Sequence, residues 1–279
     1  WTRVWRARPG RRQEAGSRGR SLGSAQTACT LLLMAALAGG VQPVHAQPKS
    51  PVEIPLSLHG NRMVVPATSE DGTSLRFLVS TGSAVTVLSE SGAARIGGGG
   101  TEMGGIPINM EGAVTVPDSD LTVDGVVMDG LVSNNTLYDF DVLFDVPGGR
   151  LVLKPFGRMV TWPGMALSEP VPLRVYHGVV LALDVEVNGS PYPAMLELGS
   201  PSLLANTAVL EKTGIEAGVA DLTLGKVVLG GLPIEQSDHP VIGRFSPNGD
   251  GFVLVGTPPA LDCAMAVSWV HRELRTCVR

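Results

Sequence analysis

Two short segments of the sequence repeat the same order of residue types and carry side chains that could do chemistry. In each segment three apolar residues lead into a polar or acidic residue, and a glycine and a serine follow. A serine hydroxyl becomes a nucleophile when a base lies within hydrogen-bond reach, and a carboxylate can move protons. The two segments lie 117 positions apart and consist of Ser80, Thr81, Gly82 and Ser83, and of Glu197, Leu198, Gly199 and Ser200.

A second pair of matching segments follows the first pair. Gly130–Ser133 and Val253–Gly256 lie 123 positions apart, and each leads into a further apolar run. Ser133 and Gly256 hold the same position in the two copies. Self-similarity over such a span indicates a duplicated structural unit. A duplication would place the first two segments at equivalent points of two similar units.

The elements that position these segments are expected to be short strands joined by turns. The chain of 279 residues has 35 Gly and 21 Pro, and Asp-Gly, Asn-Gly and Pro-Gly turns separate its apolar runs. Helices are expected at Ser89–Ile96 and Thr207–Thr213. The pattern predicts an all-β protein with a few short helices. The runs typical of strands include Arg76–Leu88, Gly125–Met128, Asp141–Phe144, Leu151–Leu153, Val179–Val187 and Lys226–Leu229.

The two pairs of matching segments resemble the active-site loops of retropepsin-like and pepsin-like aspartic proteases in their order, spacing and duplication. The resemblance covers nearly all of residues 51–279, and the family includes exported bacterial members with two lobes in one chain. It implies a two-lobed acid-protease fold with a pseudo-twofold internal repeat. The N-terminal retropepsin-like lobe would span residues 47–158, a linker residues 159–170, and the C-terminal retropepsin-like lobe residues 171–279.

In that family each lobe supplies one aspartate, which opens an Asp-Thr-Gly loop. The two carboxylates share a proton, because like charges about 3 Å apart cannot both ionise. The threonine hydroxyl braces the opposite loop. Here Ser80 and Glu197 stand at the aspartate positions, Leu198 replaces the second threonine, and Ser133 replaces a glycine that Gly256 keeps. Serine cannot ionise and glutamate is one methylene longer, so the resemblance implies a degenerate dyad.

These departures predict a pseudoprotease rather than an enzyme. Its inter-lobe cleft would bind an extended peptide by strand addition, which needs no aspartate. One alternative is an active aspartic-protease-like hydrolase that uses Glu197, or Ser80 with Glu197 as a pair, although no G-x-S-x-G elbow surrounds either serine segment. Another alternative is a structural envelope protein. No metal or cofactor is expected, because His59, His177, His239 and His271 stand singly.

Residues 1–46 are typical of a secretory signal peptide. Seven arginines and one glutamate precede the apolar run Thr30–Val41, and Val44 and Ala46 supply the small residues at positions −3 and −1 of a cleavage expected after Ala46. The sequence therefore predicts export to the periplasm or beyond. The apolar run falls short of the roughly 18 residues of a membrane span, so no transmembrane anchor is expected.

The residues that would remain after cleavage are acidic and keep two cysteines. They hold 14 Lys and Arg against 25 Asp and Glu, a net charge of −11. This balance argues against a nucleic-acid partner. Cys263 and Cys277 would form a disulfide in an oxidising compartment, with two buried thiols as the alternative. No sequence signal indicates an oligomeric state.

Overall fold

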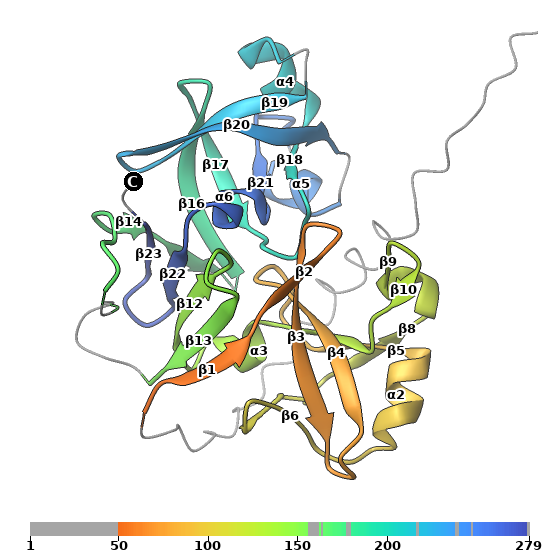
Figure 1. Ribbon diagram of the computed structural model, residues 1–279. Helices are drawn as coiled ribbons and strands as arrows, with labels where there is room; N and C mark the ends of the chain where they lie inside the picture. The colour runs from red at the N-terminus through yellow and green to blue at the C-terminus, as the bar shows by residue number, and fades with distance from the viewer. Residues whose placement is uncertain are drawn as a thin grey trace, which may run out of the picture.

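The structure is a computed structural model that describes residues 50–155, 162, 164–176, 180–215, 218–237, 240–246 and 248–277. The predicted signal peptide, residues 1–46, lies outside these residues, as do residues 159–161 and 163 of the predicted linker. Short strands dominate the described chain and its helices are short (Figure 1), so the prediction of an all-β protein is confirmed. We call residues 50–155 the first half and residues 171–277 the second half.

In the first half β9 (Thr122–Val123) and β10 (Val126–Val127), where a strand was predicted at Gly125–Met128, form a two-stranded sheet, and the main sheet has eight strands. They are β2 (Ser57–His59), β3 (Arg62–Ser69), β4 (Ser74–Val79), β5 (Val87–Ser89), β6 (Thr101–Met103), β7 (Ile106–Pro107), β8 (Val114–Val116) and β11 (Gly130–Val132). Their order is β7-β6-β3-β4-β11-β5-β8, with β2 paired to β3. The run Arg76–Leu88, expected to be extended, is interrupted after Val79 by the loop that carries Ser80–Ser83.

The second half forms one sheet of seven strands that closes on itself. They are β15 (Arg174–Tyr176), β16 (Val180–Val187), β17 (Ser190–Leu196), β18 (Leu203–Ala205), β19 (Val219–Leu224), β20 (Val227–Gln236) and β21 (Val253–Val255). Their order is β15-β16-β17-β21-β18-β20-β19, and an additional pairing of β16 with β19 closes the sheet into a barrel. The strand predicted at Lys226–Leu229 is longer than expected, because β20 continues to Gln236.

Two of the described helices were predicted. Helix α2 (Glu90–Ile96) starts one residue later than expected, because Ser89 is its N-cap and accepts a hydrogen bond from Gly92 N. Helix α4 (Thr207–Thr213) has the predicted bounds. Four short elements were not predicted, namely η2 (Asp118–Leu121), α3 (Asn134–Leu137), α5 (Pro240–Phe245) and α6 (Pro258–Leu261).

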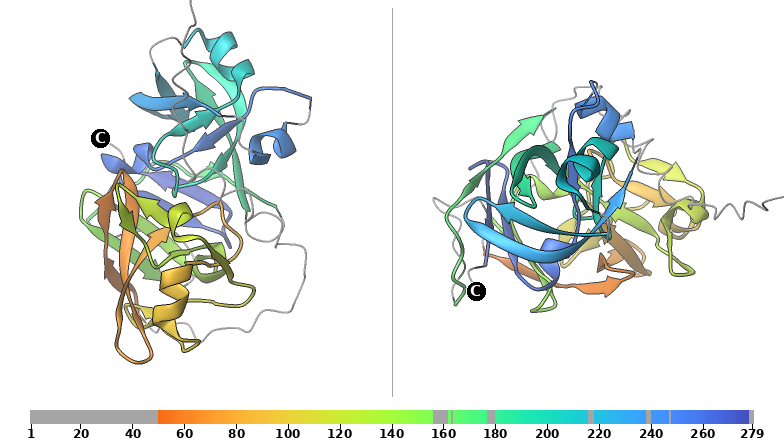
Figure 2. Two further views of the ribbon diagram at one scale, coloured as in Figure 1. Left: turned by 90° about the vertical axis from the view of Figure 1, so that its right-hand side faces the viewer. Right: turned by 90° about the horizontal axis from the view of Figure 1, so that it is seen from above.

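A third sheet contains strands from both halves, and we call it the shared sheet. Its strands are β1 (Val52–Pro55), β12 (Asp141–Asp145), β13 (Arg150–Lys154), β14 (Val171–Pro172), β22 (Met265–Ser268) and β23 (Glu273–Thr276). They lie in the order β1-β13-β12-β22-β23-β14, so β12 of the first half pairs directly with β22 of the second. Figure 2 shows this sheet between the two larger sheets.

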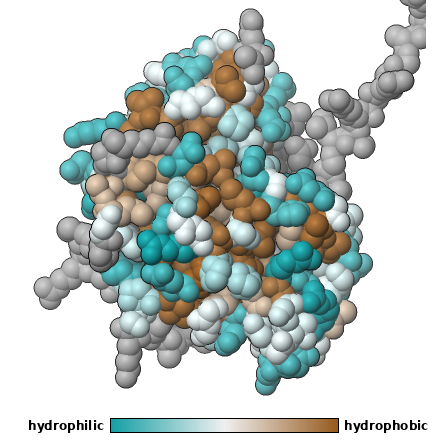
Figure 3. Space-filling model, in the orientation of Figure 1, coloured by the Kyte–Doolittle hydropathy of each residue, from teal (hydrophilic) through white to brown (hydrophobic). Residues whose placement is uncertain are grey.

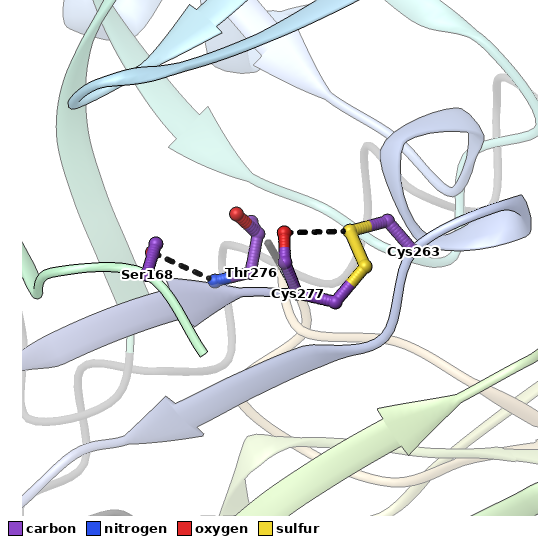
Figure 4. The surroundings of a disulfide bond; sticks show 4 residues. All are labelled: Ser168, Cys263, Thr276 and Cys277. Atoms are coloured by element: carbon purple, nitrogen blue, oxygen red, sulfur yellow. Dashed lines mark hydrogen bonds between the residues drawn. A yellow bond between two sulfur atoms is a disulfide. The ribbon is translucent and has the colours of Figure 1, made fainter. Parts of the chain in front are cut away.

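The disulfide predicted between Cys263 and Cys277 is present, beside the shared sheet (Figure 4). Cys277 N donates to Ala264 O, and Leu167 forms a β-bridge with Cys277. Next to it, Thr276 N donates to Ser168 Oγ. The bond therefore ties the last described residues to the start of β22 and lies beside the segment that joins the halves.

The two halves repeat the same strand arrangement. In the first half β4 runs parallel to β11, which pairs antiparallel with β5. In the second half β17 runs parallel to β21, which pairs antiparallel with β18. Phe77 faces Gly130 in the first pair and Ala194 faces Val253 in the second, at the offsets read from the sequence. One continuous core of buried hydrophobic residues runs through both halves and the shared sheet.

Candidate functional site

Ser80 and Glu197, the residues singled out by the repeat, are in direct contact. Ser80 follows β4 and Glu197 follows β17, so each lies in the loop that leaves the parallel strand pair of its half. Ser80 Oγ donates a hydrogen bond to Glu197 at 2.8 Å from Oε1 and 3.1 Å from Oε2. Ser80 is 1% exposed and Glu197 4% exposed, so the contact is buried between the halves.

Backbone donors surround the oxygen atoms of this pair. Gly82 N and Ser83 N each donate to Ser80 Oγ at 3.2 Å, and Gly199 N donates to Glu197 Oε1 at 2.8 Å. A Cβ at Gly82 would collide with Glu197 Oε2, so a side chain at this position would displace the Glu197 carboxyl group. The absence of a side chain at Gly82 therefore leaves room for the Glu197 carboxyl group beside Ser80.

Thr81 braces the opposite loop through its hydroxyl group. Thr81 Oγ1 donates to Leu196 O at 3.0 Å and accepts from Leu198 N at 2.9 Å. Leu198, at the equivalent position of the second half, carries no hydroxyl, and its side chain is fully buried in the continuous core. The first half therefore braces the loop of the second half through Thr81, and Leu198 makes no equivalent hydrogen bond in return.

The other contacts of the two loops come in equivalent pairs. Ser80 N donates to Val132 O, as Glu197 N donates to Val255 O. The hydroxyl groups of the serines that end the two segments are used locally. Ser83 Oγ donates to Val85 O, and Ser200 Oγ donates to Ser202 O. Neither of these two serine hydroxyls contacts Glu197, so the structure does not bring them into the pair.

Two residues that the sequence analysis missed hold the loops in place. Asn134 Nδ2 donates to Thr81 O, and Thr257 Oγ1 donates to Leu198 O. They directly follow Ser133 and Gly256, the matching residues of the second motif, so they also occupy equivalent positions. Extending the comparison of the two copies by one residue would have found them.

Ser133 and Gly256 are equivalent in sequence but differ in their surroundings. Ser133 Oγ donates to Asn135 Oδ1 at 2.6 Å, and the side chain is accommodated with no exposed surface. A Cβ on Gly256 would collide with Ser202 O and lie 2.7 Å from Ser200 O. The second half therefore requires the glycine that the first half has replaced.

Burial raises the pKa of Glu197 above its ordinary value. Hydrogen bonds from Ser80 and from the backbone of Gly199 and Gly82, and the positive charge of Arg62 on β3, oppose this shift, but burial has the larger effect. The Glu197 carboxyl group therefore keeps its proton at pH values at which an exposed glutamate has lost it.

The described residues carry neither a metal-binding cluster nor a membrane-spanning helix. No group of three or more histidine, cysteine, aspartate or glutamate side chains among them could hold a metal ion. No described helix has the length and apolar character needed to cross a membrane. No protein-family model matches the chain, and no curated protein matches it.

Removing the Thr81 hydroxyl by Thr81→Val should destabilise the contact between the halves. The nearly isosteric change leaves Leu198 N and Leu196 O buried without their partner, so we expect the free energy of unfolding to fall by about 2 kcal/mol. Urea unfolding measures it, with Thr115→Val on the exposed side of β8 as the control. Equal stability of the two variants would contradict a bracing role.

Proposed function

We propose that the chain is an exported, two-lobed relative of the aspartic proteases that binds an extended peptide and does not cleave it. The two halves correspond to the lobes, and Ser80 and Glu197 stand where that family carries its two aspartates. What supports this assignment is the contact between these two residues together with the repeated strand arrangement that delivers them.

The main support for a loss of catalysis is that the proton and both lone pairs of Ser80 Oγ already take part in hydrogen bonds. Its single proton goes to Glu197, and its two lone pairs accept from Gly82 N and Ser83 N. A general base must take a proton from the attacking water. Ser80 has no basic group, and burial raises the pKa of Glu197, so its carboxyl group loses a proton less readily than an exposed glutamate does.

Peptide binding is supported by the resemblance and by the surface. Strand addition uses main-chain hydrogen bonds and side-chain pockets, so it survives the loss of both aspartates. Figure 3 shows hydrophobic side chains gathered in the middle of one face, where the β2–β3 end of the first half lies below the second-half sheet. Leu58 on β2 is 43% exposed. Exposed apolar zones of this kind are typical of sites that bind a partner.

Export to the periplasm or beyond belongs to the same proposal. The arginine-rich start, the short apolar run and the small residues before position 47 support it. The Cys263–Cys277 disulfide supports it as well, because disulfides persist in oxidising compartments.

An active hydrolase is the second candidate, and the buried carboxyl group favours it. A protonated Glu197 could act as a general acid, as buried carboxylic acids do in other enzymes. A structural envelope protein is the third candidate. Each of the three makes a different prediction for cleavage and for binding.

Cleavage and binding of a peptide library, measured between acid and neutral pH with protein produced from the full chain, separate these candidates. We expect the wild type to bind extended peptides without cleaving them. The variant Ser80→Asp/Glu197→Asp should gain cleavage, because it restores two carboxylates of matched length. Cleavage by the wild type that disappears in Glu197→Gln would establish the hydrolase instead. Absence of peptide binding by the wild type would favour the structural role.

A further inference from the structure

The carboxyl group of Glu197 fills the centre of the contact between the two halves. Glu197 Oε1 lies 2.8 Å from the backbone N of Gly199 and 2.6 Å from the point where a Cβ of Gly199 would stand. Glu197 Oε2 lies against Gly82, so closely that a Cβ there would collide with it. Gly82 and Gly199 hold equivalent positions in the two halves. One side chain of the second half therefore occupies the space between two equivalent glycines.

The hydroxyl group of Ser80 is held so that it must donate a hydrogen bond. Gly82 N and Ser83 N each donate to Ser80 Oγ at 3.2 Å, so together they take both lone pairs of the hydroxyl oxygen. The remaining proton points to the Glu197 carboxyl group, at 2.8 Å from Oε1 and 3.1 Å from Oε2. Because Ser80 is buried, this proton needs an acceptor in place of water, and a buried donor without one is costly.

The groups that hydrogen-bond to the two Glu197 oxygens are all donors. Ser80 Oγ, Gly199 N and the backbone of Gly82 donate to them, and no described group accepts a proton from them. The positive charge of Arg62 on β3 also acts on Glu197. Such surroundings suit a carboxylate, because hydrogen bonds to a charged acceptor are strong and offset the cost of burying it. Burial raises the pKa of this group, so the carboxylate forms at a higher pH than it does in an exposed glutamate.

We propose that Glu197 is the built-in ligand of a carboxylate-binding site whose donors come from both halves. The first half supplies Ser80 Oγ and the open space over Gly82, and the second half supplies the backbone N–H of Gly199. Because Glu197 keeps this site filled, a carboxylate from outside cannot enter the centre between the halves. The inference does not depend on peptide binding, and a peptide that binds the protein would lie outside this centre.

The full-length variant Glu197→Ala, unfolded by urea at mildly alkaline pH with and without acetate, tests this site. Acetate reproduces the Cγ, the Cδ and both oxygen atoms that the substitution removes. A site with a Kd of about 10 mM would raise the folding equilibrium constant of the variant about tenfold in about 100 mM acetate. Equal concentrations of chloride or acetamide should not do so, because acetamide would turn an N–H group toward the donors.

Two further proteins serve as controls for the acetate effect. The wild type should not respond, because its site is already filled, and Ser80→Ala/Glu197→Ala should lose most of the response with the hydroxyl donor. Glu197→Ala that gains no more stability from acetate than the wild type does would overturn the proposal.

A second substitution keeps the test informative if Glu197→Ala does not fold. Glutamine has nearly the shape of glutamate, but its amide nitrogen would face one of the donors that the carboxylate satisfies. We therefore expect Glu197→Gln to lower the folding equilibrium constant at least about tenfold in urea unfolding. Glu235→Gln, exposed on β20, is the matched control and should change it little. Equal stability of the two glutamine variants would overturn the proposal. Neither experiment contains a peptide, so a failure to bind peptides would bear on the proposed function alone.

Discussion

Replacing Gly256 by serine should destabilise the protein by about 3 kcal/mol or more, the upper range for overpacking a buried site. The new Cβ would collide with Ser202 O and lie 2.7 Å from Ser200 O. Both contacts are with backbone, which cannot rotate away as a side chain could. The loop after Glu197 would have to shift, although Thr257 N and Thr257 Oγ1 anchor it at Ser200 O and Leu198 O. Urea unfolding and the yield of folded protein measure the effect.

The reverse change at the equivalent position is the informative comparison. Ser133→Gly removes the hydrogen bond to Asn135 Oδ1 and makes the unfolded backbone more flexible, so we expect a loss of about 2 kcal/mol. Gly243→Ser is the matched control for the glycine-to-serine change, because a Cβ on Gly243 meets no atom within 4 Å. Its effect should stay within about 0.5 kcal/mol. A Gly256→Ser protein as stable as the Gly243→Ser protein would contradict this account of the two positions.

Removing the disulfide by Cys263→Ala/Cys277→Ala should lower the free energy of unfolding by about 3 kcal/mol, because the unfolded chain loses a cross-link that closes a short loop. The cysteines lie 14 positions apart, and between them run β22, at the centre of the shared sheet, and β23. The loss should therefore appear in the global unfolding transition rather than as local fraying. Denaturant unfolding followed by tryptophan fluorescence measures it, since Trp269 is buried beside β22.

Reduction of the wild type supplies the control for this substitution. Wild type with its disulfide reduced and Cys263→Ala/Cys277→Ala should unfold at the same denaturant concentration, because both lack the cross-link. If reduction leaves the denaturant midpoint of the wild type unchanged, the disulfide does not contribute to the free energy of unfolding.

The parts of the fold that sequence predicts well are those with a local signal. The bounds of α4 follow from a helical stretch preceded by the capping residue Asn206, whose Oδ1 accepts from Val209 N. The equivalence of β4 with β17 and of β11 with β21 follows from the duplicated motifs. A short apolar run predicts a strand but does not indicate which other strand it pairs with. The pairing of β1 with β13 across about a hundred residues therefore has no local signal.

The contact between Ser80 and Glu197 joins two residues that the repeat singles out, but its hydrogen bonds could not be predicted from the sequence. The repeat identifies Ser80 and Glu197, but the three donors and acceptors around Ser80 Oγ depend on where the backbone of Gly82 and Ser83 lies. Helix α3, which begins with Asn134, is four residues long and too short to show a helical period. The hydrogen bond from Asn134 to Thr81 O was missed for that reason.

The shared sheet decides how this protein can be dissected in the laboratory. A fragment ending at Lys154 would contain β12 without its neighbour β22, leaving one side of a strand with unpaired backbone groups. The side chains of Val142, Leu143 and Phe144, with no exposed surface in the intact chain, would lose part of their cover. Open apolar strands of this kind recruit other chains and aggregate. A truncated protein would therefore aggregate, and its lost activity would say nothing about the role of the missing half. Single substitutions in the intact chain avoid this problem.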